Sequence, residues 1–245
     1  MKLGKLPRRD DARTLKLGAY LQPGAGPLPA LLPVPPGCDW VRSTTAWPLY
    51  RNDTVADCTV VATAHQILAW TTWTGAGAAV PEDAVVAAYL ELAGGDEEAG
   101  AVQLDVLKRW RAQGLGGHSI EAFVAVDPRH ADHVRAAIAL FGGCILGLQL
   151  PRTAEHQAIW DTNAPTDDDA AAGSWGGHAV VALAYDAEGL TVITWGAPKR
   201  MTWAFLEAYA DEAWAALSSD FLAGGAAPNG LDIAALRRDL AEVGS

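Results

Sequence analysis

The clearest hydrophobic pattern in the chain lies between residues 58 and 73. Apolar side chains recur there with helical spacing, at Val60, Val61, Ala64, Ile67 and Leu68. This spacing predicts a buried helix of about four turns. The polar segment before it ends in Asp57, a residue type that favours the N-cap position. Cys58 is therefore expected in the first turn of this helix.

Further helices and strands follow from the same kind of pattern. Helices are predicted at residues 81–93, 102–113, 127–140 and, in a short form, 204–209. Strands are predicted at residues 120–126, 141–151, 178–185, 190–196 and 200–203, with an edge strand added at 213–217. Because helices come first and strands dominate afterwards, the chain is expected to form an α+β fold.

Three segments lack this regular patterning. Residues 1–35 are rich in Pro, Gly and Leu and predict an extended arm that wraps the body, by packing or as a self-inhibitory element. Residues 152–177 form a long connection, and because loops of this length are usually functional, it is expected to overhang the site. Residues 223–245 predict a linker and an amphipathic helix that docks on the body or on a second copy.

The candidate chemistry consists of one cysteine and one distant histidine. A thiol in the first turn of a helix lies near the positive end of the helix dipole, which predicts a lowered pKa for Cys58. Glycines lead into the apolar run that begins at His178, so His178 is expected at the exposed start of a buried strand. A cysteine and a histidine held in this way can form a thiolate–imidazolium pair.

Residues 35–40, Pro-Pro-Gly-Cys-Asp-Trp, look like the opening of a mature papain-like cysteine peptidase. Asn52 lies twelve residues after Trp40 and six before Cys58, which is the family's spacing for its oxyanion-hole glutamine. The resemblance therefore implies that Cys58 is the nucleophile and that Asn52, with the Cys58 backbone N–H, stabilises the oxyanion.

The second half of the resemblance surrounds His178. His178-Ala-Val, Tyr185 and the Trp195-Gly196 pair match the family's block around its catalytic histidine. The resemblance covers roughly residues 35–196 and implies a papain-like α+β fold. In it a helical lobe, residues 36–117, carries Cys58 and packs against an antiparallel β lobe, residues 118–222, which carries His178.

Four departures from the family pattern shape the expected site. Asn52 replaces glutamine, and Ala56-Asp57-Cys58-Thr59 replaces the family's signature around the nucleophile. Ile193 stands where the Trp195-Gly196 pair would align the histidine-orienting asparagine. Thr194, sixteen residues after His178, is the neighbouring residue with a hydrogen-bond acceptor and is expected to orient the imidazole. No pro-region of family length precedes residue 35, which suggests a short bacterial variant.

Three further residues are expected to contact the substrate: Trp175, Trp195 and Asp161. Asp161 lies in the 152–177 connection and is the first alternative to Thr194 as the partner of His178. No metal ion or other cofactor is expected. The His130–His133 pair lacks a third ligand, and the three cysteines are too scattered for a thiolate metal site.

Composition limits the partners. A net charge of −11 argues against nucleic acid and anionic membranes. The basic N-terminus has no signal-peptide core, and no apolar run reaches membrane-spanning length, so a cytoplasmic location is expected.

The expected partner is a peptide or an amide-containing small molecule, and a homodimer stays open. Three functions remain: a cysteine hydrolase, an acyltransferase that forms amides on the same dyad, or a catalytically silent binding protein.

Overall fold

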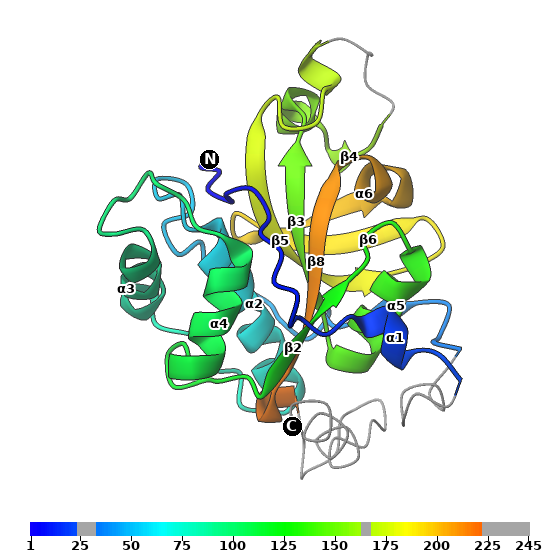
Figure 1. Ribbon diagram of the computed structural model, residues 1–245, viewed down its shortest axis with the longest axis horizontal. Coiled ribbons are helices and arrows are strands. Elements are labelled where there is room, and N and C mark those ends of the chain that lie inside the picture. Colours follow the sequence, from blue (N-terminus) through cyan, green and yellow to red (C-terminus); the bar gives the residue numbers. More distant parts are fainter. Residues whose placement is uncertain (24–32, 163–167, 222–245) are drawn as a thin grey trace.

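A helical part and a β-sheet part lie side by side in the computed structural model, which describes residues 1–23, 33–162 and 168–221 (Figure 1). The helical part contains α2 (Cys58–Trp73), α3 (Glu82–Leu92) and α4 (Gln103–Gln113). The elements that follow are almost all strands, with α5 (Ala131–Phe141) and α6 (Trp203–Tyr209) between them. This arrangement is the predicted α+β fold. The C-terminal helix predicted within residues 223–245 lies outside the described residues.

The sheet contains eight strands within the described part of the chain. Seven follow the order β2-β8-β3-β5-β6-β7-β4, and β1 pairs with β5. All pairs are antiparallel except β4 with β7. The strands are β1 (Cys38–Asp39), β2 (Ala122–Val126), β3 (Cys144–Leu150), β4 (Ile159–Trp160), β5 (Gly176–Tyr185), β6 (Gly189–Thr194), β7 (Ala197–Thr202) and β8 (Ala210–Leu217).

The helix α2 is the centre of the helical part and packs against β5. Fourteen of its sixteen residues are buried, because it is apolar on nearly all sides and is enclosed by α3, α4 and the sheet. Polar side chains of α2 also reach the end of α5. Gln66 Nε2 donates to the carbonyl of Gly142 at 2.9 Å, and Trp70 Nε1 donates to that of Phe141 at 2.8 Å. These bonds fix α2 relative to the sheet.

The strand predicted at residues 213–217 was wrongly assigned to the edge of the sheet. It is the second half of β8, which lies between β2 and β3 and is buried along most of its length. The sequence order gives no sign of this position, because β8 is the last strand of the part of the chain that the structure describes and inserts between two earlier ones. The edge strand on this side is β2.

The first residues of the chain follow the boundary between the helices and the sheet. In Figure 1 the blue trace runs from the N-terminus across β5, β3 and β8 towards the short helix α1 (Leu17–Tyr20). Residue 5 forms an isolated bridge with Ala101, next to α4. The beginning of the predicted arm is therefore held between the two parts of the fold.

Candidate active site

Cys58 is the first residue of α2, as predicted, and its thiol faces the start of β5. The backbone N–H of Ala179 donates to Cys58 Sγ at 3.4 Å. Ala179 follows His178 directly, so the helix start and the strand start bring the two candidate residues together although 120 positions separate them in the sequence. Cys58 is 1% exposed and His178 is fully buried. The expectation of an exposed His178 was therefore wrong, because neighbouring segments cover the start of β5.

Thr194 lies within hydrogen-bond distance of the histidine. The Oγ atom of Thr194, the last residue of β6, is 2.7 Å from His178 Nε2. The other ring nitrogen, Nδ1, is buried and has no hydrogen-bond partner. Nε2 is therefore occupied, and Nδ1 is the nitrogen left to exchange a proton with a nearby thiol. Thr194 is thus placed where the sequence expected an orienting group.

Trp195 covers the imidazole on one face. Its ring stacks on that of His178 with centroids 4.5 Å apart and an interplanar angle of 16°, and Trp175 packs against Trp195 at 5.5 Å. Trp195 has a φ of 46°, which is uncommon for a residue with a bulky side chain. The turn that follows β6 therefore holds its indole in a fixed position over His178.

Asn52 is buried beside Cys58 but its side-chain amide is engaged. Asn52 Nδ2 donates to Asp57 Oδ1 at 2.9 Å, and the second oxygen of Asp57 has no hydrogen-bond partner. Asp57 stands at the N-cap position, but its side chain makes no capping hydrogen bond. The prediction that Asp57 caps the helix was therefore wrong in its chemistry, because the carboxyl group turns towards Asn52 instead.

The predicted lowering of the Cys58 pKa was also wrong for this arrangement. Burial raises the pKa of the thiol to about 11, against smaller opposing effects of backbone hydrogen bonds from Ala179 and Gly4. Burial also lowers the pKa of His178 to about 3. Both groups are therefore neutral here, because the helix dipole is too weak to offset the loss of water around the thiol.

Asp57 responds to the same buried environment. Burial raises its pKa to about 7, although the hydrogen bond from Asn52 acts in the opposite direction. A carboxyl group next to the candidate nucleophile can therefore be protonated or ionised near neutral pH.

The side chain of Asp161 bonds to the start of α6 rather than to the imidazole of His178. Its Oδ1 accepts a hydrogen bond from the Thr202 hydroxyl at 3.0 Å, at the end of β7. Its backbone carbonyl accepts one from Gln157 at 2.9 Å. These contacts fold the first part of the 152–177 connection against β7, and Thr194 rather than Asp161 holds Nε2 of His178.

The segment formed by residues 2–6 covers the site. The backbone N–H of Lys2 donates to the Asn52 carbonyl at 3.1 Å, and Trp195 Nε1 donates to the Lys2 carbonyl at 3.2 Å. The Gly4 backbone lies close enough to the Cys58 thiol to oppose the rise in its pKa. Lys5 then donates its backbone N–H to the Gly177 carbonyl at 3.1 Å.

The same segment is bound to the helical part. Ala101 N–H donates to the Gly4 carbonyl at 2.8 Å, and Leu6 N–H donates to the Ala101 carbonyl at 3.0 Å. A Cβ atom on Gly4 would lie 1.8 Å from the Ala56 carbonyl oxygen, so only glycine allows this close approach. Sequence analysis missed this contact, since nothing in the glycine's local sequence indicates what it lies against.

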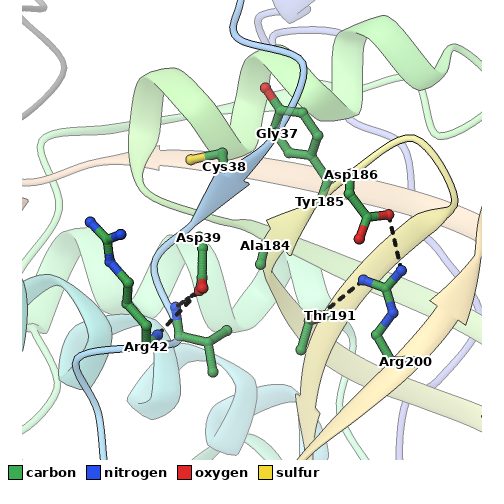
Figure 2. A pocket seen from close by; sticks show the side chains of 10 residues that line it. Gly37, Cys38, Asp39, Arg42, Ala184, Tyr185, Asp186, Thr191 and Arg200 are labelled. Atoms are coloured by element: carbon green, nitrogen blue, oxygen red, sulfur yellow. Dashed lines mark hydrogen bonds and ion pairs between the residues drawn. The ribbon is translucent and has the colours of Figure 1, made fainter.

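The other cysteines lie elsewhere. Cys144 is buried in β3, and burial raises the pKa of its thiol to about 12. Cys38 borders a surface pocket at the far end of β5, next to Tyr185 and Arg200 (Figure 2). Ala184, which lines this pocket, lies six positions after His178 along β5, a distance of about 20 Å. Burial raises the pKa of Cys38 to about 11, so this pocket holds no second activated thiol.

Among the residues described, no group of three or more His, Cys, Asp or Glu side chains is arranged to hold a metal ion. No helix within residues 1–23, 33–162 and 168–221 is long and apolar enough to cross a membrane.

Comparisons with solved structures identify the fold. The chain superimposes on xylellain, a cysteine protease from Xylella fastidiosa, with a TM-score of 0.66 and 14% identity over 88% of this chain and 96% of that one. It also superimposes on the bromelain protease of Ananas comosus, solved with the inhibitor E-64, with a TM-score of 0.55 and 12% identity over 76% and 100% of the two chains.

A third similar structure is digestive procathepsin L 3 from Tenebrio molitor, with a TM-score of 0.55 and 9% identity over 76% of this chain and 70% of that one. No protein-family model matches the sequence. No curated protein matches it either. The protein has the papain-like fold, and the fold class predicted from the sequence motifs is confirmed.

Proposed function

We propose that the protein is a cysteine hydrolase that cleaves a peptide or amide bond through Cys58 and His178. The observation that carries the proposal is that the two ring nitrogens of His178 have different surroundings. The Thr194 hydroxyl is within hydrogen-bond distance of Nε2, whereas Nδ1 has no hydrogen-bond partner. The Cys58 thiol lies 3.4 Å from the backbone nitrogen of Ala179, the residue that follows His178. A nucleophile beside an oriented base is the arrangement that acyl transfer needs.

The proposed reaction has two halves. Nδ1 of His178 accepts the thiol proton while Cys58 Sγ attacks the carbonyl carbon, and the negative charge on the carbonyl oxygen is stabilised by Asn52 Nδ2 and the Cys58 backbone N–H. The C–N bond then breaks, the amine leaves with the proton from His178, and a thioester remains. Water next attacks the thioester, gives its proton to His178, and releases the acid, with the thiol restored.

Two features have to change before the reaction can start. Residues 2–6 must leave Cys58, because the thiol is 1% exposed while they cover it. Water entering the cleft would then lower the cost of forming the thiolate–imidazolium pair. Asn52 must also turn its amide from Asp57 towards the developing oxyanion. The described arrangement is therefore a closed state of the proposed enzyme.

Covalent labelling tests the proposal. Intact mass measured after incubation with E-64 should show one added inhibitor per chain in a Gly4→Ala variant, in which the covering segment is displaced. Wild type should react more slowly. Cys58→Ser and His178→Ala should abolish the labelling, whereas the matched Cys38→Ser and Cys144→Ser variants should retain it. Labelling that maps to Cys38 or Cys144 would contradict the proposed dyad.

Activity measurements then separate the remaining alternatives. Turnover of peptide or amide substrates in water supports hydrolysis, whereas product formation that depends on an added amine supports acyl transfer to that amine. A chain that binds peptides but neither labels nor turns over would be a silent binding protein.

A further inference from the structure

The side chain of Lys5 is completely buried next to the candidate nucleophile. Its Nζ lies 3.0 Å from Asp211 Oδ2 and 3.1 Å from Glu212 Oε1, and it also donates to the carbonyl of Leu6 at 3.2 Å. The Lys5 side chain is 0% exposed and that of Glu212 is 3% exposed. A buried ammonium group needs such partners, because an unpaired charge in this environment is strongly unfavourable.

The pocket that receives Lys5 is built from strands of the sheet. Asp211 and Glu212 belong to β8, and Gln149 on the neighbouring strand β3 donates to Asp211 Oδ2 at 2.7 Å. Gly147 of β3 leaves the space for the lysine, since a Cβ atom there would lie 2.3 Å from Lys5 Cε. Glu212 Oε2 is fixed by Trp214 Nε1 at 2.8 Å. These groups form a rigid acidic pocket.

The pocket has acceptors that one lysine does not fill. The ammonium of Lys5 contacts both carboxylate groups, while the second nearby cation, Arg8, donates to the backbone carbonyl of Asp211 at 2.9 Å rather than to a carboxylate of the pocket. Asp211 Oδ1 is buried without a hydrogen-bond partner. A guanidinium group carries five N–H donors and could use this free oxygen as well. The pocket therefore suits a basic side chain in general rather than only the lysine that occupies it here.

The position of the pocket relates it to the proposed cleavage site. Gly4 packs against Ala56, two residues before Cys58, and its backbone is close enough to influence the Cys58 thiol. The next residue, Lys5, donates its backbone N–H to the carbonyl of Gly177, which precedes His178. The backbone of residues 4–6 also pairs with Ala101 across the cleft. Residues 2–6 therefore occupy the cleft as an extended peptide, with one side chain inserted in the acidic pocket.

We infer that Asp211 and Glu212 form a specificity pocket for a lysine or arginine side chain of the substrate, next in sequence to the residue that lies over Cys58. This inference rests on the proposed function. In the closed state the pocket is filled by the chain's own Lys5. An uncharged side chain would exclude water from the two carboxylates without neutralising them. The pocket is therefore expected to disfavour uncharged side chains and to favour basic ones.

Peptide cleavage provides the first test. The full-length Gly4→Ala variant is assayed with fluorogenic peptides that carry lysine or norleucine at each position around the scissile bond. At one position lysine should raise kcat/KM by about 10- to 100-fold over norleucine. Glu212→Gln should reduce this ratio to a few-fold, and Asp211→Asn should also lower it. The exposed acid Glu207, on α6, supplies the control, because Glu207→Gln removes the same charge outside the pocket.

Peptide binding provides a second test that does not depend on catalysis. A labelled hexapeptide with the sequence of residues 1–6 is titrated into the same Gly4→Ala protein, and fluorescence anisotropy gives the Kd. Norleucine in place of Lys5 should weaken binding by about 10- to 100-fold. Norleucine in place of Lys2, whose amine pairs with Glu98 at the surface, should change it less than about threefold.

The two tests have separate consequences. Cleavage without any preference for a basic residue, or a preference that survives Glu212→Gln, would overturn the specificity pocket and leave the proposed hydrolase intact. Charge-selective binding without cleavage or labelling would support the pocket and contradict the hydrolase. Absence of hexapeptide binding, or equal binding of the lysine and norleucine peptides, would also overturn the pocket.

Discussion

Replacement of Asp57 by asparagine should remove a pH-dependent loss of folding stability that arises from the buried carboxyl group. The carboxyl group of Asp57 is buried, and its pKa is raised by that burial from 3.8 to about 7. The folded protein therefore keeps a proton on Asp57 over a pH range in which the unfolded chain has lost it. Stability from this group falls as the pH rises from about 4 to about 7 and is constant above that.

The magnitude follows from the size of the pKa change. About three pKa units correspond to about 4 kcal/mol, at about 1.4 kcal/mol per unit. Asp57→Asn keeps an oxygen for the hydrogen bond from Asn52 but cannot ionise. The variant should therefore gain up to about 4 kcal/mol relative to wild type on going from about pH 4 to about pH 8.

Urea denaturation followed by tryptophan fluorescence measures this difference at the two pH values. Asp53→Asn is the matched control, because Asp53 is an exposed aspartate of the same turn region. The control should change stability relative to wild type equally at both pH values. If Asp57→Asn also differs from wild type by the same amount at both, Asp57 does not titrate in the folded protein as argued, and the reasoning fails.

Substitutions at three other positions test the groups around the dyad. Gly4→Ala should raise the rate of Cys58 alkylation by iodoacetamide at least tenfold, because a Cβ would force the segment away from Ala56; an unchanged rate would mean that the segment does not limit access. Thr194→Val should lower kcat/KM about tenfold or more and leave His178 Nε2 unpaired, whereas Thr194→Ser should restore activity; equal activity of both would contradict an orienting role. Asn52→Ala should lower kcat by about 10²–10³ with little change in KM, and full turnover would remove Asn52 from the oxyanion site.

The local elements could be read from the sequence because their signals are local. The apolar stripe of residues 58–73 predicted α2, and the glycine-led apolar run predicted the strand that holds His178. A helix start or a strand start depends on neighbouring residues, so the positions of Cys58 and His178 within their elements were correct. Alternation along β6 also indicated that Thr194 rather than Ile193 offers a polar group on its face.

The tertiary structure decided what surrounds those residues, since burial and partners depend on segments distant in sequence. The sequence indicated a thiol activated by a helix dipole, but the burial of Cys58 in the folded protein reverses the direction of its pKa shift. The carboxyl group of Asp57 bonds to Asn52 rather than to the helix end for the same kind of reason.

The acidic pocket could not be found from the sequence either. Lys5 and Glu212 are separated by 207 positions, and they meet only because β8 inserts between β2 and β3 while the N-terminus crosses the sheet. The sequence by itself thus determined the main helices and strands, though not the short elements α1, β1 and β4, together with the papain-like motifs and the identity of the two reactive residues proposed. The packing of distant segments decided their protonation, their accessibility and the side chain that the cleft accepts, because these depend on desolvation and charge pairing in three dimensions.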